Sequence, residues 1–154
     1  MSKKTNYPAL YTSWVGMMQR CNYKYSKSYV DYGGRGIKVC DDWKIFKNYQ
    51  TWILENLGNK PSRDYSLDRI DNSGNYEPGN VRWATRLQQV HNRRLFKNNH
   101  SGYKGVSWHK RVNKWVAQIR IDGHKKHLGY FETPELAHEV YKTVFKTLVE
   151  RKAK

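Results

Sequence analysis

The sequence lacks the features that define membrane, secreted and disulfide-stabilised proteins. None of its apolar runs approaches the roughly 20 residues that a membrane-spanning helix needs. The first residues, MSKKTNYPALY, contain no hydrophobic signal region, so we expect a cytoplasmic protein with no membrane partner. Cys21 and Cys40 are the only cysteines, which excludes a disulfide scaffold and a four-thiolate zinc site. A zinc site of two cysteines and two histidines stays open, although the sequence has no Cys-x-x-Cys pair.

Acidic residues are also scarce. The 154 residues carry 29 Lys and Arg against 13 Asp and Glu, a formal net charge of +16. The first 100 residues hold +9 of this charge and the remainder +7, so it is not confined to a basic tail. Aromatic residues make up 14% of the chain, more than a disordered polycation would have. An evenly basic, aromatic-rich chain favours a polyanionic partner, nucleic acid above all.

The first part of the chain has the pattern of two amphipathic helices. Apolar spacing predicts helices over 10–21 and 43–57, the second ended by Gly58. Between them lies a loop with three glycines at 33, 34 and 36, followed by a short strand over 37–40. The backbone amides of such a loop can hold a phosphate, but the loop is equally consistent with a simple turn.

A compact strand–turn–strand–helix pattern follows. Residues 65–71 have strand character, 72–75 form a turn, and a second short strand ends near Trp83. Thr85 is a suitable N-cap for a helix that runs to Asn92 or Arg93. These four elements occupy about thirty residues.

The polar, unpatterned segment near residues 97–102 marks a domain boundary, which divides the chain into 1–97 and 98–154. Beyond it, apolar and polar residues alternate over 114–121, the pattern of a half-buried strand. Asp122-Gly123 predicts a hairpin turn, and Thr133-Pro134-Glu135 predicts the start of a helix. We therefore expect a three-stranded sheet backed by one helix, in a protein of the α+β class.

The segment 101–141 resembles the AP2 DNA-binding domain. The shared motifs are Lys104-Gly105-Val106, Lys114-Trp115, Ile119-Arg120, Leu128-Gly129-Tyr130-Phe131 and the helix that begins at Pro134. The resemblance implies an antiparallel sheet that lies in the major groove of double-stranded DNA. Matching positions give the expected DNA contacts as Lys104, Ser107, His109, Arg111, Gln118, Arg120, Lys125 and His127. The alternative is a solvated polar sheet face without a ligand.

The segment SLDRIDNSGNYEPGNVRWATRLQQVHNRR resembles the HNH, or His-Me finger, nucleases. The resemblance implies a ββα unit around one divalent metal and an endonuclease activity. Magnesium, or manganese in its place, is the expected cofactor, because hard cations prefer oxygen ligands. Asp68 occupies the place of the first metal ligand, and Gln89 that of the helix ligand. Asn92 lies three residues further on the same helix face, so either amide oxygen could reach the metal.

Arg69 stands where most members of this family have the histidine that activates water. An arginine stays protonated and cannot act as a general base. Some restriction endonucleases of the superfamily carry Asp-Arg at this place, which implies that Arg69 contacts the scissile phosphate. Tyr32 is the first candidate for assisting the nucleophile, and Asn80 is expected to brace the catalytic ribbon.

The sequence therefore predicts a homing-type or nicking DNA endonuclease with an AP2 targeting domain. The two resemblances together match the arrangement of phage proteins that fuse an HNH nuclease to an AP2 domain. We therefore expect the protein in the cytoplasm of a bacterial host. No obligatory protein partner is inferred. The alternative is a non-catalytic, sequence-specific DNA-binding protein with a degenerate HNH unit. An RNA-binding protein ranks lower, because side chains cannot read the deep, narrow major groove of RNA.

Overall fold

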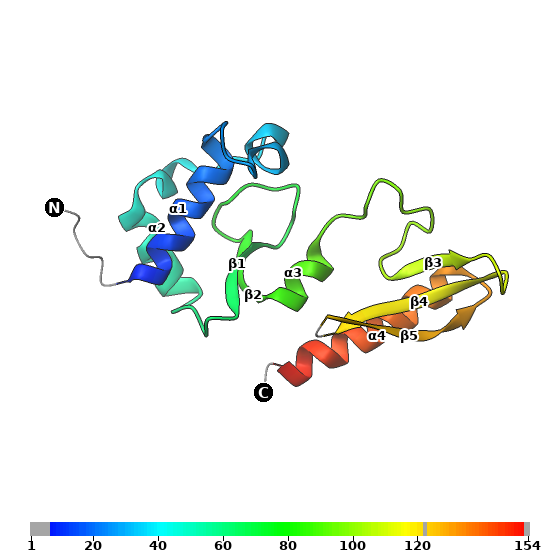
Figure 1. Ribbon diagram of the computed structural model, residues 1–154. Helices are drawn as coiled ribbons and strands as arrows, with labels where there is room; N and C mark the ends of the chain where they lie inside the picture. The colour runs from blue at the N-terminus through cyan, green and yellow to red at the C-terminus, as the bar shows by residue number, and fades with distance from the viewer. Residues whose placement is uncertain (1–6, 122, 153–154) are drawn as a thin grey trace. The chain divides into compact units, whose positions relative to one another are not determined.

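The computed structural model describes residues 7–121 and 123–152, and within these the chain forms two compact units. The first unit extends to Asn92, and the second begins at Arg93, a few residues before the predicted boundary. The mixture of helices and antiparallel strands confirms the predicted α+β composition (Figure 1). Among the described helices, none combines the length and apolar character needed to cross a bilayer.

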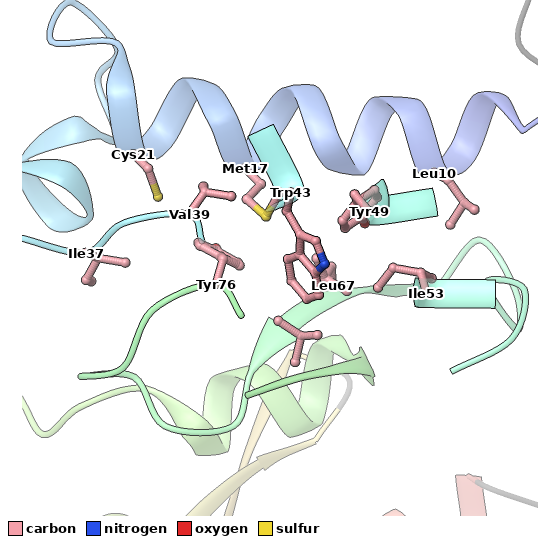
Figure 2. Packing of buried hydrophobic residues seen from close by; sticks show 11 residues of the cluster. Leu10, Met17, Cys21, Ile37, Val39, Trp43, Tyr49, Ile53, Leu67 and Tyr76 are labelled. Atoms are coloured by element: carbon pink, nitrogen blue, oxygen red, sulfur yellow. The ribbon is translucent and has the colours of Figure 1, made fainter. Parts of the chain in front are cut away.

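The first unit is built around helix α1 (Pro8–Asn22). Its predicted apolar stripe is confirmed, because Leu10, Met17 and Cys21 are all buried. These side chains point from α1 into a layer that is closed on its other side by the ribbon of strands β1 (Tyr65–Arg69) and β2 (Val81–Thr85) (Figure 2). Trp43 lies in the middle of this core, and its carbonyl accepts a 2.7 Å hydrogen bond from Nε1 of Trp14.

Two predicted elements of this unit differ in the structure. The helix predicted over 43–57 is divided into a 3₁₀ turn, η3 (Asp41–Lys44), and helix α2 (Phe46–Asn56). Ile45 between them is extended, and the bond from Trp14 occupies the Trp43 carbonyl. The strand predicted over 37–40 makes only one bridge, from Val39 to Tyr76.

This bridge does not grow into a strand because its partner segment turns away. The side-chain oxygen of Asn75 accepts the Lys38 N–H, and the Asn80 N–H closes a turn onto the Glu77 carbonyl. The predicted glycine-rich loop contains two 3₁₀ turns, η1 (Tyr29–Asp31) and η2 (Gly33–Arg35).

The ribbon and the following helix form as predicted. Strands β1 (Tyr65–Arg69) and β2 (Val81–Thr85) pair antiparallel, and α3 (Arg86–Asn92) follows directly. Thr85 caps α3 as expected: its side-chain oxygen accepts the Gln88 N–H, and the Gln88 side chain accepts the Thr85 N–H. This reciprocal cap fixes the direction in which α3 leaves β2.

The second unit is a three-stranded antiparallel sheet with one long helix. The strands β3 (Val106–His109), β4 (Lys114–Ile121) and β5 (His124–Phe131) follow in sequence order, and α4 (Pro134–Lys152) contacts all three. Thr133 caps α4 as predicted, by accepting the Leu136 N–H. Of the predicted hairpin turn between β4 and β5, Asp122 lies outside the described residues.

The register of β5 shifts beside Ala117 and Gln118 of β4, which leaves Leu128 as an extra residue in the ladder. A regular strand would place Leu128 and Phe131 on opposite faces, because their numbers differ by three. With the bulge, both pack into the core that contains Ala137 of α4. The bulge thus frees the other face of the sheet for polar residues.

Candidate functional site

Asp68 is the centre of a polar cluster between the β1–β2 ribbon and α3. It lies directly opposite Arg82 on β2. Its Oδ2 accepts hydrogen bonds from Nε and Nη2 of Arg82, at 3.3 and 3.1 Å, and from Nδ2 of Asn92 at 3.2 Å. The Asp68 side chain is only 13% exposed, against 38% for Arg82. The fold therefore holds one carboxylate in a fixed place at the junction of ribbon and helix.

The structure distinguishes between the two candidate helix residues. Asn92 reaches the Asp68 carboxylate and also donates to the Arg69 carbonyl at 2.5 Å. Gln89 instead donates to Oγ of Ser66 at 2.5 Å and to the Ala84 carbonyl at 3.0 Å. Gln89 lies almost one turn earlier on α3 and therefore faces the strand residue two positions before Asp68. The structure brings Asn92 to Asp68 and leaves Gln89 beside Ser66.

Asn80 holds the loop between the two strands. Its Oδ1 accepts the Asp71 N–H at 2.8 Å, and its Nδ2 donates to the carbonyls of Asp71 and Asn75 at 3.2 and 2.7 Å. A Cβ atom on Gly74 would lie 2.6 Å from Nδ2 of Asn80, so this bracing arrangement needs glycine there. These contacts join the two ends of the loop, and the role of Asn80 as a brace stays a prediction.

Arg69 has different surroundings from its neighbour Asp68. Its residue exposure is 4%, and Nη1 donates a 2.7 Å hydrogen bond to the Gly74 carbonyl. Its guanidinium carbon lies 5.1 Å from the ring centroids of both Tyr32 and Tyr76. The family resemblance implies an arginine that contacts the scissile phosphate, and the structure buries this side chain among aromatic rings. Adjacent strand residues point to opposite sides, which accounts for the difference.

Tyr32 is half-buried where η1 meets η2, and its ring stacks on Tyr76 at 6.4 Å with an interplanar angle of 15°. The structure brings Tyr32 to Arg69, and its expected part in assisting the nucleophile stays a prediction. Burial raises the pKa of Tyr76 to about 12, so Tyr76 is a protonated, structural neighbour of this site.

The donor set around Asp68 fits a magnesium ion only as a minimal site. Within the described residues, no three His, Cys, Asp or Glu side chains gather in a way that could hold a metal. Asp68 offers one carboxylate, with its three hydrogen bonds all on Oδ2. Asn92 turns its Nδ2, not its amide oxygen, toward Asp68 and the Arg69 carbonyl. Magnesium in phosphate-processing sites commonly takes one or two carboxylates and completes its shell with water and substrate phosphate, so a metal at this place stays a prediction.

The polar face of the second unit collects most of the predicted DNA contacts. The register sets Ser107 beside Val116, Gln118 beside His127, and Arg120 beside Lys125. Because side chains alternate between faces, the following predicted residues share the face opposite α4: Ser107, His109, Gln118, Arg120, Lys125 and His127. Six of the eight predicted contacts therefore lie on one surface.

The charge pattern of this face is unfavourable without a partner. Arg120 and Lys125 are both exposed and directly opposite each other, and opposed like charges destabilise a sheet. The ring of Tyr130 lies 5.3 Å from that of His109 and 4.5 Å from that of His127, which holds both imidazoles in place. A polyanion would relieve the repulsion between the two cations.

The other two predicted contacts lie beside the strands. Arg111 is exposed in the turn between β3 and β4. Lys104 lies in the loop before β3, where its carbonyl oxygen is 3.2 Å from Nδ1 of His138. Burial lowers the pKa of the Lys104 ammonium.

Three residues of the first site were not among the predicted site residues. Arg82 pairs with Asp68, Tyr76 stacks on Tyr32, and Arg20 of α1 lies over the same two rings. The position of Arg82 could have indicated its role, because Asp68 and Arg82 lie on the two strands of the predicted ribbon and directly opposite residues interact. Arg20 is far away in the sequence, and only the packing of α1 brings it close.

Comparisons with protein-family models, curated proteins and solved structures gave no significant match to this chain.

Proposed function

We propose that the chain is a metal-dependent DNA endonuclease of the HNH type, with an AP2-like sheet that holds DNA through the major groove. The observation that carries this proposal is the ribbon–helix unit with Asp68 at its junction, in hydrogen-bonding contact with Arg82 and Asn92. The AP2-like part is supported by the strand order, the single helix and the polar face described above.

In this proposal Asp68 and Asn92 hold the magnesium ion, and Arg82 orients the Asp68 carboxylate. A bound divalent cation neutralises the scissile phosphate and stabilises the leaving oxygen. Hydrolysis forms a bond from a water oxygen to phosphorus and breaks one phosphorus–oxygen ester bond. Tyr32 packs on Arg69, whose side chain points away from that of Asp68, and it is kept as the proposed group for the proton of the attacking water; unchanged cleavage by Tyr32→Phe would rule it out. Asn80 keeps the loop that supports Arg69 in shape.

The sheet supplies target selection. Arg120 can form paired hydrogen bonds with guanine and Gln118 with adenine, whereas Lys125 is suited to a phosphate. Arg120→Gln is expected to weaken binding to the preferred sequence more than binding to unrelated DNA. Lys125→Gln is expected to weaken both about equally.

The test is cleavage of supercoiled DNA by the full chain, with magnesium, with manganese and with a chelator. The wild type should convert supercoiled circles to relaxed or linear DNA only with metal. Asp68→Asn should lose this activity and still bind DNA in a gel shift. Asp64→Asn is the matched control, because Asp64 is an exposed carboxylate just before the same ribbon. Equal background cleavage by wild type and Asp68→Asn would overturn the enzymatic proposal.

A second candidate function is that of a non-catalytic DNA-binding protein. The burial of Arg69 and the ion pair of Arg82 favour this candidate. The ion pair already compensates Asp68, and the histidine expected at position 69 is absent. This candidate shares the sheet face with the first. It would be supported by sequence-selective binding that Arg120→Gln weakens, together with no metal-dependent cleavage.

A further inference from the structure

Two arginines from distant parts of the first unit meet at one pair of tyrosine rings. The guanidinium carbon of Arg20, near the end of α1, lies 5.1 Å from the ring centroid of Tyr32 and 5.7 Å from that of Tyr76. That of Arg69, at the end of β1, lies 5.1 Å from both. Guanidinium groups at such distances are held by the negative faces of aromatic rings. The same two rings therefore hold two positive charges.

These charges are poorly compensated by the protein. Arg69 is 4% exposed, and its one side-chain hydrogen bond goes to a neutral carbonyl. The Nε of Arg20 is buried and has no hydrogen-bond partner among residues 7–121 and 123–152. In the same part of the chain, neither guanidinium lies within 4.0 Å of a carboxylate oxygen. A buried cation without a counter-ion is costly, and two cations held at the same rings repel each other.

The ligand that would remove this cost is an anion with several oxygen atoms. Guanidinium groups bind phosphate through paired, parallel hydrogen bonds, which an ammonium cannot do. Arg20 and Tyr32 are both only half-buried, so the cluster can be reached from their side although Arg69 is buried. The two guanidinium groups lie against the rings of Tyr32 and Tyr76.

We propose that Arg20 and Arg69, held by Tyr32 and Tyr76, form a phosphate-binding site for the DNA backbone. This rests on the proposed function in one respect, because the phosphate is taken to belong to the DNA substrate. Arg20 is then a DNA-contacting residue of the first unit. The site also places a backbone phosphate beside the hydroxyl-bearing ring of Tyr32.

The experiment compares the full-length wild type with Arg20→Gln, with Lys47→Gln as the control for removing one positive charge. Lys47 is exposed on α2 of the same unit. DNA binding is measured with a chelator present, over a series of salt concentrations, so that cleavage plays no part. Thermal unfolding of each protein is measured in inorganic phosphate and in chloride of equal ionic strength. Circular dichroism checks that each variant is folded.

The site predicts that Arg20→Gln reduces the slope of log affinity against log salt by about 0.9, the value for one lost phosphate contact. It also predicts that phosphate raises the melting temperature of the first unit in wild type and Lys47→Gln but less in Arg20→Gln. An unchanged slope and an unchanged phosphate effect would overturn the site. If only the phosphate effect changes, the site binds free phosphate, and the assignment to DNA is wrong.

Arg20→Lys keeps the positive charge but cannot form the paired hydrogen bonds. It replaces Arg20→Gln in these assays if Arg20→Gln does not fold. It should lose most of the phosphate effect, and full retention would count against the site. The chelated binding assay and the melting assay do not depend on catalysis. A chain that shows the Arg20 effects but never cleaves DNA would therefore refute the endonuclease proposal and leave the phosphate site standing.

Discussion

Replacing Asn80 tests whether this residue braces the site or takes part in the reaction. Asn80→Ala removes three hydrogen bonds of 2.7 to 3.2 Å, one to the Asp71 N–H and two to carbonyl oxygens. Each such bond contributes about 0.5–1.5 kcal/mol net, and water can replace part of them in this loop. We expect the first unit to lose about 2 kcal/mol of its free energy of unfolding.

The measurement is urea unfolding of the full chain, with separate fits for the two units because they need not unfold together. A loss of about 2 kcal/mol lowers the urea midpoint of the first unit by about 1–2 M for a slope of 1–2 kcal/mol per M. Asn80→Asp is the informative second variant. It keeps an acceptor for the Asp71 N–H but turns a second oxygen toward the carbonyls of Asp71 and Asn75. It should be at least as destabilised as Asn80→Ala.

A brace and a catalytic group give different combinations of results. If Asn80 is a brace, any loss of DNA cleavage should follow the loss of folded protein and diminish at low temperature. An unchanged urea midpoint combined with a lost cleavage rate would refute the bracing role and make Asn80 catalytic.

The remaining predictions concern packing and pH. Gly105 has φ +72°, and a Cβ there would lie 2.2 Å from the Tyr141 ring, so Gly105→Ala should destabilise the second unit by about 2–4 kcal/mol in thermal unfolding. Gly102→Ala is its control, since Gly102 has φ +73° with open space around it and should cost only about 1 kcal/mol; equal effects would contradict the clash. Burial raises the pKa of Tyr76 to about 12, so its contribution to folding is present below the ordinary value and is lost as pH rises from about 10 to about 12. Urea unfolding across this range should show a loss of about 2–3 kcal/mol from this residue, and Tyr76→Phe should flatten the decline; an equally steep decline would contradict it.

The sequence was sufficient for elements whose signals are local. The apolar spacing of Leu10, Met17 and Cys21 predicted α1, and the cap residues Thr85 and Thr133 predicted where α3 and α4 begin. The strand alternation over 114–121 predicted which face of the second sheet is polar. These signals depend on neighbours within a few residues, which a sequence displays directly.

The sequence was insufficient wherever distant segments compete. The break at Ile45 depends on a hydrogen bond from Trp14, and the failed strand at 37–40 depends on how the chain turns after Tyr76. The site shows the same limit. Adjacent residues Asp68 and Arg69 were both assigned to the reaction centre, but their environments differ, because Arg69 packs against rings from other segments.

The most direct test of the central claim is whether Asp68 holds a metal when DNA is bound. Manganese binding to the protein–DNA complex can be followed by electron paramagnetic resonance of the free ion, in wild type, Asp68→Asn and the control Asp64→Asn. The proposed site predicts one bound manganese ion in wild type and Asp64→Asn that Asp68→Asn loses. Equal manganese binding by all three complexes would contradict the assignment of Asp68 as the metal ligand.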